Sequence, residues 1–193
     1  MKVIAINGSA RKDGNTALLV NKALTELEAN GIETELVQLA GKKLAGCIAC
    51  YKCFENKDKR CAVKNDDMNP VIDKMATADG IILASPTYFA DCTAGLKAVI
   101  ERAGFVSRAN GNMFRLKPGA AIVAVRRAGA IHAFDTINHF FTISEMITVG
   151  SIYWNIGLGR EVGEVSTDEE GMKTMAALGQ NMAWLMRKIK GNA

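Results

Sequence analysis

Short apolar runs alternate with amphipathic stretches along most of the chain, and this alternation predicts the fold class. The third run, Ile81–Ala84, is apolar at every position, which is typical of a strand covered on both faces. Between the runs, apolar residues recur at helical spacing, as in the stripe that includes Leu96, Val99 and Ala103. Strands and helices that alternate in this way form an α/β fold with a parallel sheet and helices on both faces. The predicted strands are Val3–Asn7, Glu33–Leu39, Gly80–Ser85, Ala120–Val125 and Val149–Trp154.

One segment interrupts the alternation. Residues 41–67 form a connection too long for a simple loop, and they hold four of the five cysteines. Long connections in compact domains are uncommon and are usually functional or disordered. Because the chain has 193 residues, no repeat and no clear linker, we expect a single domain over residues 1–193 that carries this cysteine-rich excursion.

Composition and charge narrow the function classes. The chain is 49% hydrophobic and 23% charged, as ordinary soluble proteins are, and its net charge of +4 is well short of a nucleic-acid-binding footprint. No apolar run approaches the length that spans a membrane, and the N-terminus leads directly into the first strand. We therefore expect a cytoplasmic protein with no nucleic-acid or membrane partner. Cysteines in that compartment are usually reduced, metal-binding or redox-active.

The loop after the first strand is the most informative candidate site. It is rich in glycine and hydroxyl side chains, carries one arginine, and leads directly into a helix. A phosphate monoester binds well there, because unpaired N–H groups and the positive end of the helix dipole face the anion. The loop has neither the G-x-G-x-x-G pattern of dinucleotide sites nor the Gly-Lys-Ser/Thr of a Walker loop, so FMN is the favoured ligand. The candidate phosphate contacts are Ser9, Arg11, Asn15 and Thr16; alternatively, Asn15 only caps the helix and Arg11 is a solvated charge.

Five strands that begin with a phosphate loop favour the strand order 2-1-3-4-5 of a flavodoxin-like three-layer sandwich, whose ligand lies beside strand 1. The loop after the third strand would flank the same crevice. It carries Pro86, Thr87, Tyr88 and Phe89, which could form a wall against a flat isoalloxazine ring. The alternative is an aromatic turn that packs on its own helix.

Two adjacent arginines follow the fourth strand. Arg126 and Arg127 could balance negative charge at flavin N1 and O2, or bind a phosphate of the electron donor. Alternatively, they are surface arginines that pair with acidic neighbours.

Four cysteines are clustered in the excursion. Cys47, Cys50 and Cys53 follow a C-x2-C-x2-C spacing, and Cys61 comes after seven intervening residues. Three cysteines at this spacing resemble the compact run that binds a [4Fe–4S] cluster, and the fourth completes the ligand count. A zinc ion is an alternative, although structural zinc sites usually separate their cysteine pairs by a longer spacer. The thiols could also hold no metal. Cys92 lies apart and is expected to fill space.

The segment Phe134–Ile147 is predicted to be a helix whose apolar arc is wider than one sheet face can cover. A second subunit is the simplest cover for the remainder, so we expect a homo-oligomer. The only histidines are His132 and His139, and the sequence contains no nucleophile elbow or zinc-protease motif. Hydrolytic chemistry is therefore not indicated.

Taken together, these motifs resemble the NADPH-dependent FMN reductase branch of the flavodoxin-like superfamily, and within it the iron–sulfur flavoproteins. The similarity is carried by Gly8–Thr16, Ser85–Phe89, Leu96–Arg102 and the cysteines that precede Asp66. It implies that the first loop binds FMN phosphate and that residues 86–89 hold the isoalloxazine. It also implies a compact four-cysteine motif for an iron–sulfur cluster, and a homodimer or homotetramer with flavin near a subunit interface.

The function indicated is that of an FMN-dependent NAD(P)H:acceptor oxidoreductase, in which a reduced nicotinamide delivers hydride to flavin N5 and an unknown acceptor takes the electrons. No side chain is required as an acid or base. An iron–sulfur flavoprotein that relays single electrons between FMN and a four-cysteine cluster is an alternative. A binding module on the same fold, without flavin, is a third.

Overall fold

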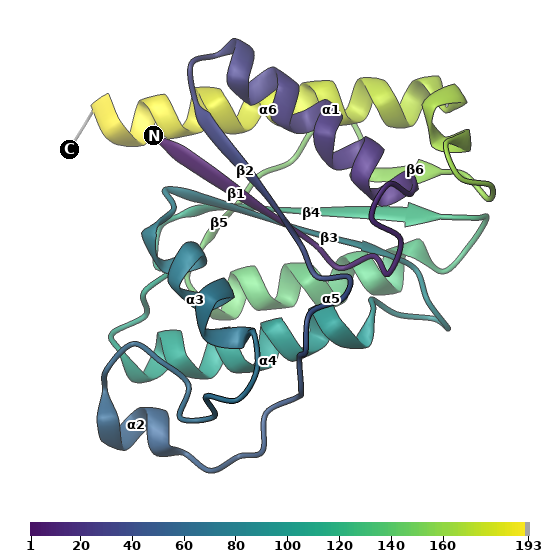
Figure 1. Cartoon of the computed structure of the whole chain (residues 1–193). Helices are drawn as coiled ribbons and strands as arrows, with labels where there is room; N and C mark the ends of the chain where they lie inside the picture. The colour runs from purple at the N-terminus through teal and green to yellow at the C-terminus, as the bar shows by residue number, and fades with distance from the viewer. Residues whose placement is uncertain (192–193) are drawn as a thin grey trace.

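The computed structural model describes residues 1–191 and arranges them in three layers, with a parallel sheet between two layers of helices (Figure 1). The strands are β1 (Lys2–Asn7), β2 (Glu33–Gln38), β3 (Gly80–Pro86), β4 (Pro118–Val125), β5 (Ile147–Thr148) and β6 (Ile156–Leu158). The helices are α1 (Asn15–Ala29), α2 (Lys52–Asn56), α3 (Met68–Thr77), α4 (Ala94–Ala109), α5 (Ala130–Ile143), the 3-10 helix η1 (Glu164–Thr167) and α6 (Glu169–Gly191). Within these residues, no helix is both long and apolar enough to cross a membrane.

The strand order is β2-β1-β3-β4-β5, which confirms the flavodoxin-like order predicted from the sequence. Neighbouring strands are parallel, and β3 and β4 are buried along nearly their whole length. Asn7 at the end of β1 pairs with Ala84 near the end of β3. The loops that leave these two strands therefore emerge side by side at the carboxyl edge of the sheet.

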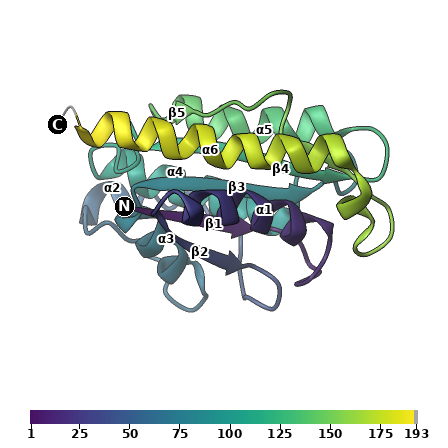
Figure 2. The same cartoon turned by 90° about the horizontal axis from the view of Figure 1, so that it is seen from above.

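Each face of the sheet carries its own apolar core. Helices α1 and α6 pack over one face, where Leu19 and Met182 meet the side chains of β1 and β4. Helices α3, α4 and α5 cover the opposite face, where Val99 and Phe141 belong to the second core. Figure 2 shows α1 and α6 lying alongside each other above the strands. Both faces of the strands are thus dry, which explains their continuous apolar runs.

The fifth position of the sheet differs from the prediction. The predicted strand Val149–Trp154 is wrong, because two short strands, β5 and β6, pair with β4 on either side of that segment. Between them, residues 150–154 leave the sheet, and Ile152, Tyr153 and Trp154 are exposed. β-propensity marked these residues as a strand, but their side chains have no core to enter, and pairing with β4 resumes only at Ile156.

Helix α5 is also offset from the predicted span of Phe134–Ile147. It begins at Ala130 and ends at Ile143, and Glu145 turns the chain in the left-handed region (φ +55°) toward β5. Other elements of the same chain cover more of the apolar surface of α5 than the sequence predicted. Phe140 and Phe141 are both buried, because α4 and the sheet lie on different sides of α5, and Phe140 contacts the ring of Phe114. Ile143 remains exposed.

Candidate functional site

The loop between β1 and α1, residues 8–14, brings a helix N-terminus to the carboxyl edge of the sheet. Gly14 precedes the helix and supplies no side-chain cap, so the first two N–H groups of α1 have neither a capping side chain nor a helical carbonyl to bond. Ser9 and Thr16 are buried at this helix end, and Arg11 is exposed beside it. Free N–H groups, two hydroxyls and a guanidinium form a donor set suited to a phosphate.

A polar network from two strands fixes this loop. Asn7 Oδ1 accepts a hydrogen bond from Ser9 N at 3.0 Å, and Asn7 Nδ2 donates to Gln38 Oε1 at 2.7 Å. Gln38 Nε2 in turn donates to the Ser9 carbonyl at 2.7 Å. The loop is therefore held in one conformation by strand residues on β1 and β2, before any ligand binds.

The loops after β1 and β3 are joined to each other. Gly8 N donates to the Ala84 carbonyl at 2.8 Å, and Thr93 Oγ1 donates to the Gly8 carbonyl at 2.8 Å. A side chain at Gly8 would not fit, because a Cβ there would lie 2.9 Å from Thr93 Oγ1 and 2.9 Å from Leu96 Cβ. Thr93 also caps α4 by accepting from Leu96 N at 3.3 Å. One threonine thus links both loops and starts the helix that follows.

Pro86 is the last residue of β3, and the loop that follows starts with Thr87. Thr87 N donates to the Ala124 carbonyl of β4 at 2.9 Å. The Thr87 hydroxyl is buried, and it has no hydrogen-bond partner among residues 1–191. A buried hydroxyl in this position is an unused donor and acceptor at the carboxyl edge of the sheet, next to β4.

The tip of the same loop carries the two aromatic residues. Tyr88 and Asp91 exchange two backbone hydrogen bonds, at 2.8 and 3.1 Å, which close a tight turn. Phe89 lies in the turn with a left-handed φ of 39°, and its side chain is fully exposed. Tyr88 is about half-exposed. The exposed ring of Phe89 therefore does not pack on the helix that follows.

The loop after β4 lies next to the aromatic loop. Arg126 and Arg127 are exposed, and Gly129, with φ +87°, turns the chain into α5. A Cβ on Gly129 would lie 3.5 Å from Thr87 Cγ2, so the two loops are in contact. The structure therefore brings the three candidate flavin loops together at one edge of the sheet.

Asn15 has a different environment from its neighbours. Its amide nitrogen donates to the Glu161 carbonyl at 2.9 Å, and its amide oxygen accepts from Gly163 N at 2.9 Å. The side chain thus fastens the segment before η1 to the start of α1. Asn15 is the first residue of the helix, and Gly14 is its N-cap.

The four cysteines of the excursion line one cavity. Cys47, Cys50, Cys53 and Cys61 surround a space of about 20 Å³, together with Arg102, Phe105 and Val106 of α4. Burial raises the pKa of the Cys53 thiol, and the adjacent Cys61 and Cys47 raise it further. Within residues 1–191, no three Cys, His, Asp or Glu side chains are spaced to hold a single metal ion.

The fifth cysteine lies outside this group. Cys92 is buried beside the aromatic loop, and burial, followed by the charge of Asp91, raises its pKa to about 11. A thiol with so high a pKa is not a nucleophile at neutral pH. This agrees with the expected space-filling role.

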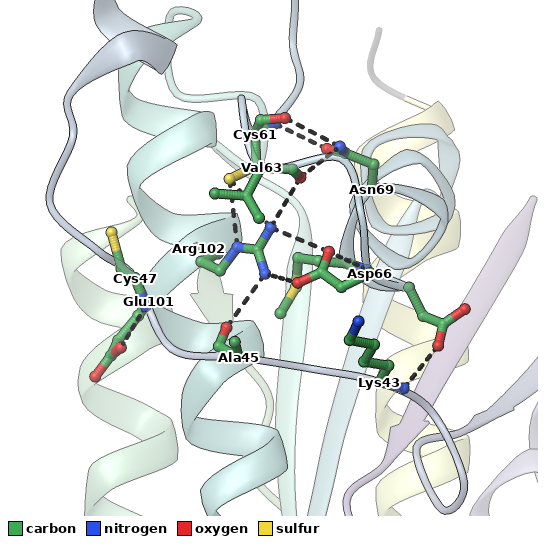
Figure 3. Close-up of polar contacts among 11 residues, drawn as sticks. Lys43, Ala45, Cys47, Cys61, Val63, Asp66, Asn69, Glu101 and Arg102 are labelled. Atoms are coloured by element: carbon green, nitrogen blue, oxygen red, sulfur yellow. Dashed lines mark hydrogen bonds and ion pairs between the residues drawn. The ribbon is translucent and has the colours of Figure 1, made fainter.

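A buried ion pair anchors the excursion to α4. The guanidinium of Arg102 bonds both carboxylate oxygens of Asp66, and the two side chains are only 2% and 3% exposed. Burial raises the pKa of Asp66, but the hydrogen bonds from Arg102 and from Met68 N, together with the charges of Arg102 and Lys43, outweigh it and hold the pKa below its usual range. Figure 3 shows Arg102 pointing from α4 into the fold of the excursion, between Ala45, Cys61 and Asp66.

Comparison with known proteins decides the family. The model of the NADPH-dependent FMN reductase family matches residues 1–161. The chain belongs to this family. It is therefore a flavin oxidoreductase or electron-transfer protein that uses FMN. An iron-sulfur flavoprotein of Methanocaldococcus jannaschii is 39% identical over 98% of this chain and 100% of its own length. One from Methanosarcina thermophila is 31% identical over 100% and 98%.

Solved structures agree on the fold of this FMN reductase family member. A flavodoxin from an archaeon superposes with a TM-score of 0.63 at 15% identity, and the match covers 97% of this chain and 99% of that one. A crystal structure of RosB superposes with a TM-score of 0.77 at 19% identity, over 99% and 81% of the two chains.

Sequence reasoning missed three residues that organise these sites. Thr93 joins two loops, and Arg102 and Asp66 form the buried pair. A signal for Arg102 was present, because it lies on the buried side of α4 among Val99 and Val106, where an arginine needs an acidic partner. The sequence alone could not identify that partner, 36 residues away.

Loss of the buried carboxylate should destabilise the protein much more than loss of an exposed one. Asp66→Ala leaves the Arg102 charge buried and unpaired, so the free energy of unfolding should fall by about 3–5 kcal/mol. Asp73→Ala is the control, because its ion pair with Arg60 is about half-exposed and should contribute at most about 1 kcal/mol. Urea unfolding measured by circular dichroism makes the comparison, and equal losses in the two variants would contradict it.

Proposed function

We propose that this protein is an NAD(P)H:acceptor oxidoreductase whose FMN lies at the carboxyl edge of the sheet, over the loops that leave β1, β3 and β4. A bound FMN would supply the redox chemistry, which is acceptance of a hydride at N5 from a reduced nicotinamide and release of electrons in pairs or singly. The chain itself binds and orients the flavin and keeps water from it. An external acceptor completes the turnover.

The observation that carries this proposal is the set of unused donors gathered at that edge. The first N–H groups of α1 lack a side-chain cap, and the buried Thr87 hydroxyl lacks a partner within residues 1–191. Buried polar groups are normally paired, so a ligand with phosphate and carbonyl oxygens fits a site that leaves them free. FMN has both kinds of oxygen.

In this proposal the phosphate is held at the start of α1. Ser9 and Thr16 would offer hydroxyls, Arg11 would provide a charge-assisted bond, and Asn15 would contribute its backbone N–H. The side chain of Asn15 would act indirectly, by fixing the segment near Gly163 against the same helix end.

The isoalloxazine would lie against the loop after β3. Pro86 and the Tyr88–Phe89 turn would form an apolar wall, and the fully exposed ring of Phe89 supports a role in contacting flavin, nicotinamide or a second subunit. Arg126 and Arg127 would place positive charge near N1 and O2, where reduction leaves negative charge, or would bind a phosphate of the nicotinamide.

We further propose that Cys47, Cys50, Cys53 and Cys61 hold a [4Fe–4S] cluster, which supplies one-electron transfer. Two facts support it: the four thiols line one cavity, and the relatives named above are iron-sulfur flavoproteins. The cavity is about the size of one water site, but one of its walls is an exposed segment in which α2 has no buried residue. Outward movement of that segment would make room, at the expense of the ring contacts that Tyr51 and Phe54 make with Phe105.

The phosphate loop is tested by removing its charge and one hydroxyl. Arg11→Ala combined with Thr16→Ala should weaken FMN binding by about 2–4 kcal/mol, because one charge-assisted bond and one hydroxyl donor are lost. Lys12→Ala is the matched control, since it removes one exposed charge from the same loop. Calorimetric titration of the FMN-free protein gives the affinities. Equal FMN affinity in the double variant and in wild type would refute the assignment of this loop to the FMN phosphate.

The reaction and the cluster are tested together on anaerobically purified protein. NADPH or NADH should bleach the flavin absorbance, and the protein should contain iron and acid-labile sulfide. Each of the variants Cys47→Ala, Cys50→Ala, Cys53→Ala and Cys61→Ala should lose iron and keep FMN, because the flavin loops lie elsewhere. Cys92→Ser should keep both. Flavin without iron or sulfide, even after reconstitution, would refute the cluster, and flavin that neither nicotinamide reduces would refute the reductase.

We also propose that the protein is a homodimer or homotetramer. A groove of about 540 Å³ runs between α4 and α5, and Phe105 and Ile143 at its rim are exposed. Another subunit would cover these side chains. Light scattering should report at least a dimer at micromolar concentration, and Ile143→Glu should shift it toward the monomer. A wild-type monomer would exclude the proposal.

A further inference from the structure

Arg102 has more contacts with the cysteine segment than a structural anchor requires. Its guanidinium is almost completely buried, and its donors are divided among three groups of acceptors. Nη1 and Nη2 bond the Asp66 carboxylate, and they also donate to the carbonyls of Ala45 and Val63, each at 3.2 Å. These contacts hold both ends of the excursion. The guanidinium makes two further contacts, which reach a sulfur atom and do not hold the backbone of the excursion.

Both of those contacts reach the sulfur of Cys61. Arg102 Nε lies 3.3 Å and Arg102 Nη2 lies 3.2 Å from Cys61 Sγ (Figure 3). A neutral thiol is a weak acceptor, whereas a thiolate accepts strong, charge-assisted bonds from a guanidinium. A planar donor fork directed at one sulfur is thus suited to a sulfur that carries negative charge.

The backbone of Cys61 is fixed independently of Arg102. Cys61 N donates to Asn69 Oδ1 at 2.8 Å, and Asn69 Nδ2 donates to the Cys61 carbonyl at 3.0 Å. The position of the residue is therefore already determined by Asn69. Arg102 therefore contacts the sulfur atom of Cys61 and does not bond its backbone.

The other cysteines of the excursion have different hydrogen-bond partners. Cys47 Sγ accepts one backbone bond, from Ala49 N at 3.4 Å, and the backbone of Cys47 is held by Glu101 Oε2 at 3.2 Å. Among the described residues, Cys61 is the cysteine of this group whose sulfur receives side-chain donors. The four sulfurs are thus electrostatically unequal.

We propose that Arg102 is a positioning residue that raises the reduction potential of the four-cysteine centre through its two N–H···S bonds to Cys61. This inference rests on the proposed function, in which these cysteines hold a cluster. Reduction adds negative charge that spreads onto the ligand sulfurs, and donors directed at a sulfur stabilise the reduced form. Because Asp66 already balances the Arg102 charge, the effect comes from the N–H donors rather than from net charge.

The experiment compares midpoint potentials, followed by electron paramagnetic resonance in redox titrations of the anaerobic holoprotein. Arg102→Lys keeps the charge and loses the planar fork, so its potential should become more negative than that of wild type, with shifted g-values. Asp66→Asn keeps the donors to Cys61 and removes a negative charge, so its potential should become more positive. Arg108→Gln, an exposed arginine on the same helix, is the matched control and should match wild type.

A further variant separates the loss of the contacts to Cys61 from the effects of misfolding. Arg102→Met alone leaves Asp66 buried and unpaired, so the double variant Arg102→Met/Asp66→Leu replaces the pair with apolar side chains of similar size. Its potential should also become more negative, while its circular dichroism and FMN content stay at wild-type values.

The outcomes separate this inference from the proposed function. If wild type contains iron and sulfide but Arg102→Lys and the double variant titrate at the potential of Arg108→Gln, the role of Arg102 is refuted and the cluster stands. A folded Arg102→Lys variant that assembles no cluster also refutes it, because Arg102 would then act in assembly and not in tuning. If wild type contains no iron or sulfide after reconstitution, the proposed cluster fails and this inference fails with it.

Discussion

Burial of a parallel sheet on both faces is the constraint on which the rest of this structure depends. Parallel strands need a crossover after each strand, so every loop from a strand to the next helix leaves from the same edge. Helix N-termini, with their unpaired N–H groups, collect at that edge. The loops after β1, β3 and β4 therefore meet there, although they are far apart in the sequence. The candidate anion site is a consequence of the topology, and in the proposed function the side chains of the loops adapt it to a flavin.

Helix α4 connects this edge to the cysteine segment. Its first turn is capped by Thr93, which also bonds the loop after β1, and its second half carries Arg102, which bonds the excursion. The two residues are separated by roughly 13 Å along the helix, at 1.5 Å per residue. A rigid helix therefore fixes the relative position of the two candidate sites.

The sequence predicted the layers and the strand order, because apolar periodicity depends on burial, and burial is what the fold imposes on β1, β3 and β4. It misplaced the last strand, since Tyr153 and Trp154 have strand propensity but lie in an exposed loop. The sequence also overestimated how much apolar surface of α5 the chain leaves exposed, because α4 covers Phe140. The spacing of apolar residues along one helix contains no information on its neighbouring helices.

The candidate loops were found from residue type and position, but the partners of single polar side chains were not. Asn15 was expected to cap a helix or bind phosphate, and it bonds a segment near residue 163. Arg102 was passed over, and it holds Asp66 and Cys61. Such contacts join residues that are distant in the chain. Each depends on backbone geometry at two places at once, which local patterns do not specify.

Polar anchors and a few aromatic contacts order the excursion. Helix α2 contributes no buried residue, but the rings of Tyr51 and Phe54 pack on Phe105 of α4. Polar contacts hold the two ends of the segment. Glu101 holds the backbone of Cys47, and Asn69 with Arg102 holds Cys61. Cys47 and Cys61 are thus attached to the rigid core, whereas Cys50 is exposed and Cys53 is partly buried on α2 between them. A ligand that binds all four thiols would tie this segment to the core, and by linkage its binding free energy would stabilise the folded excursion.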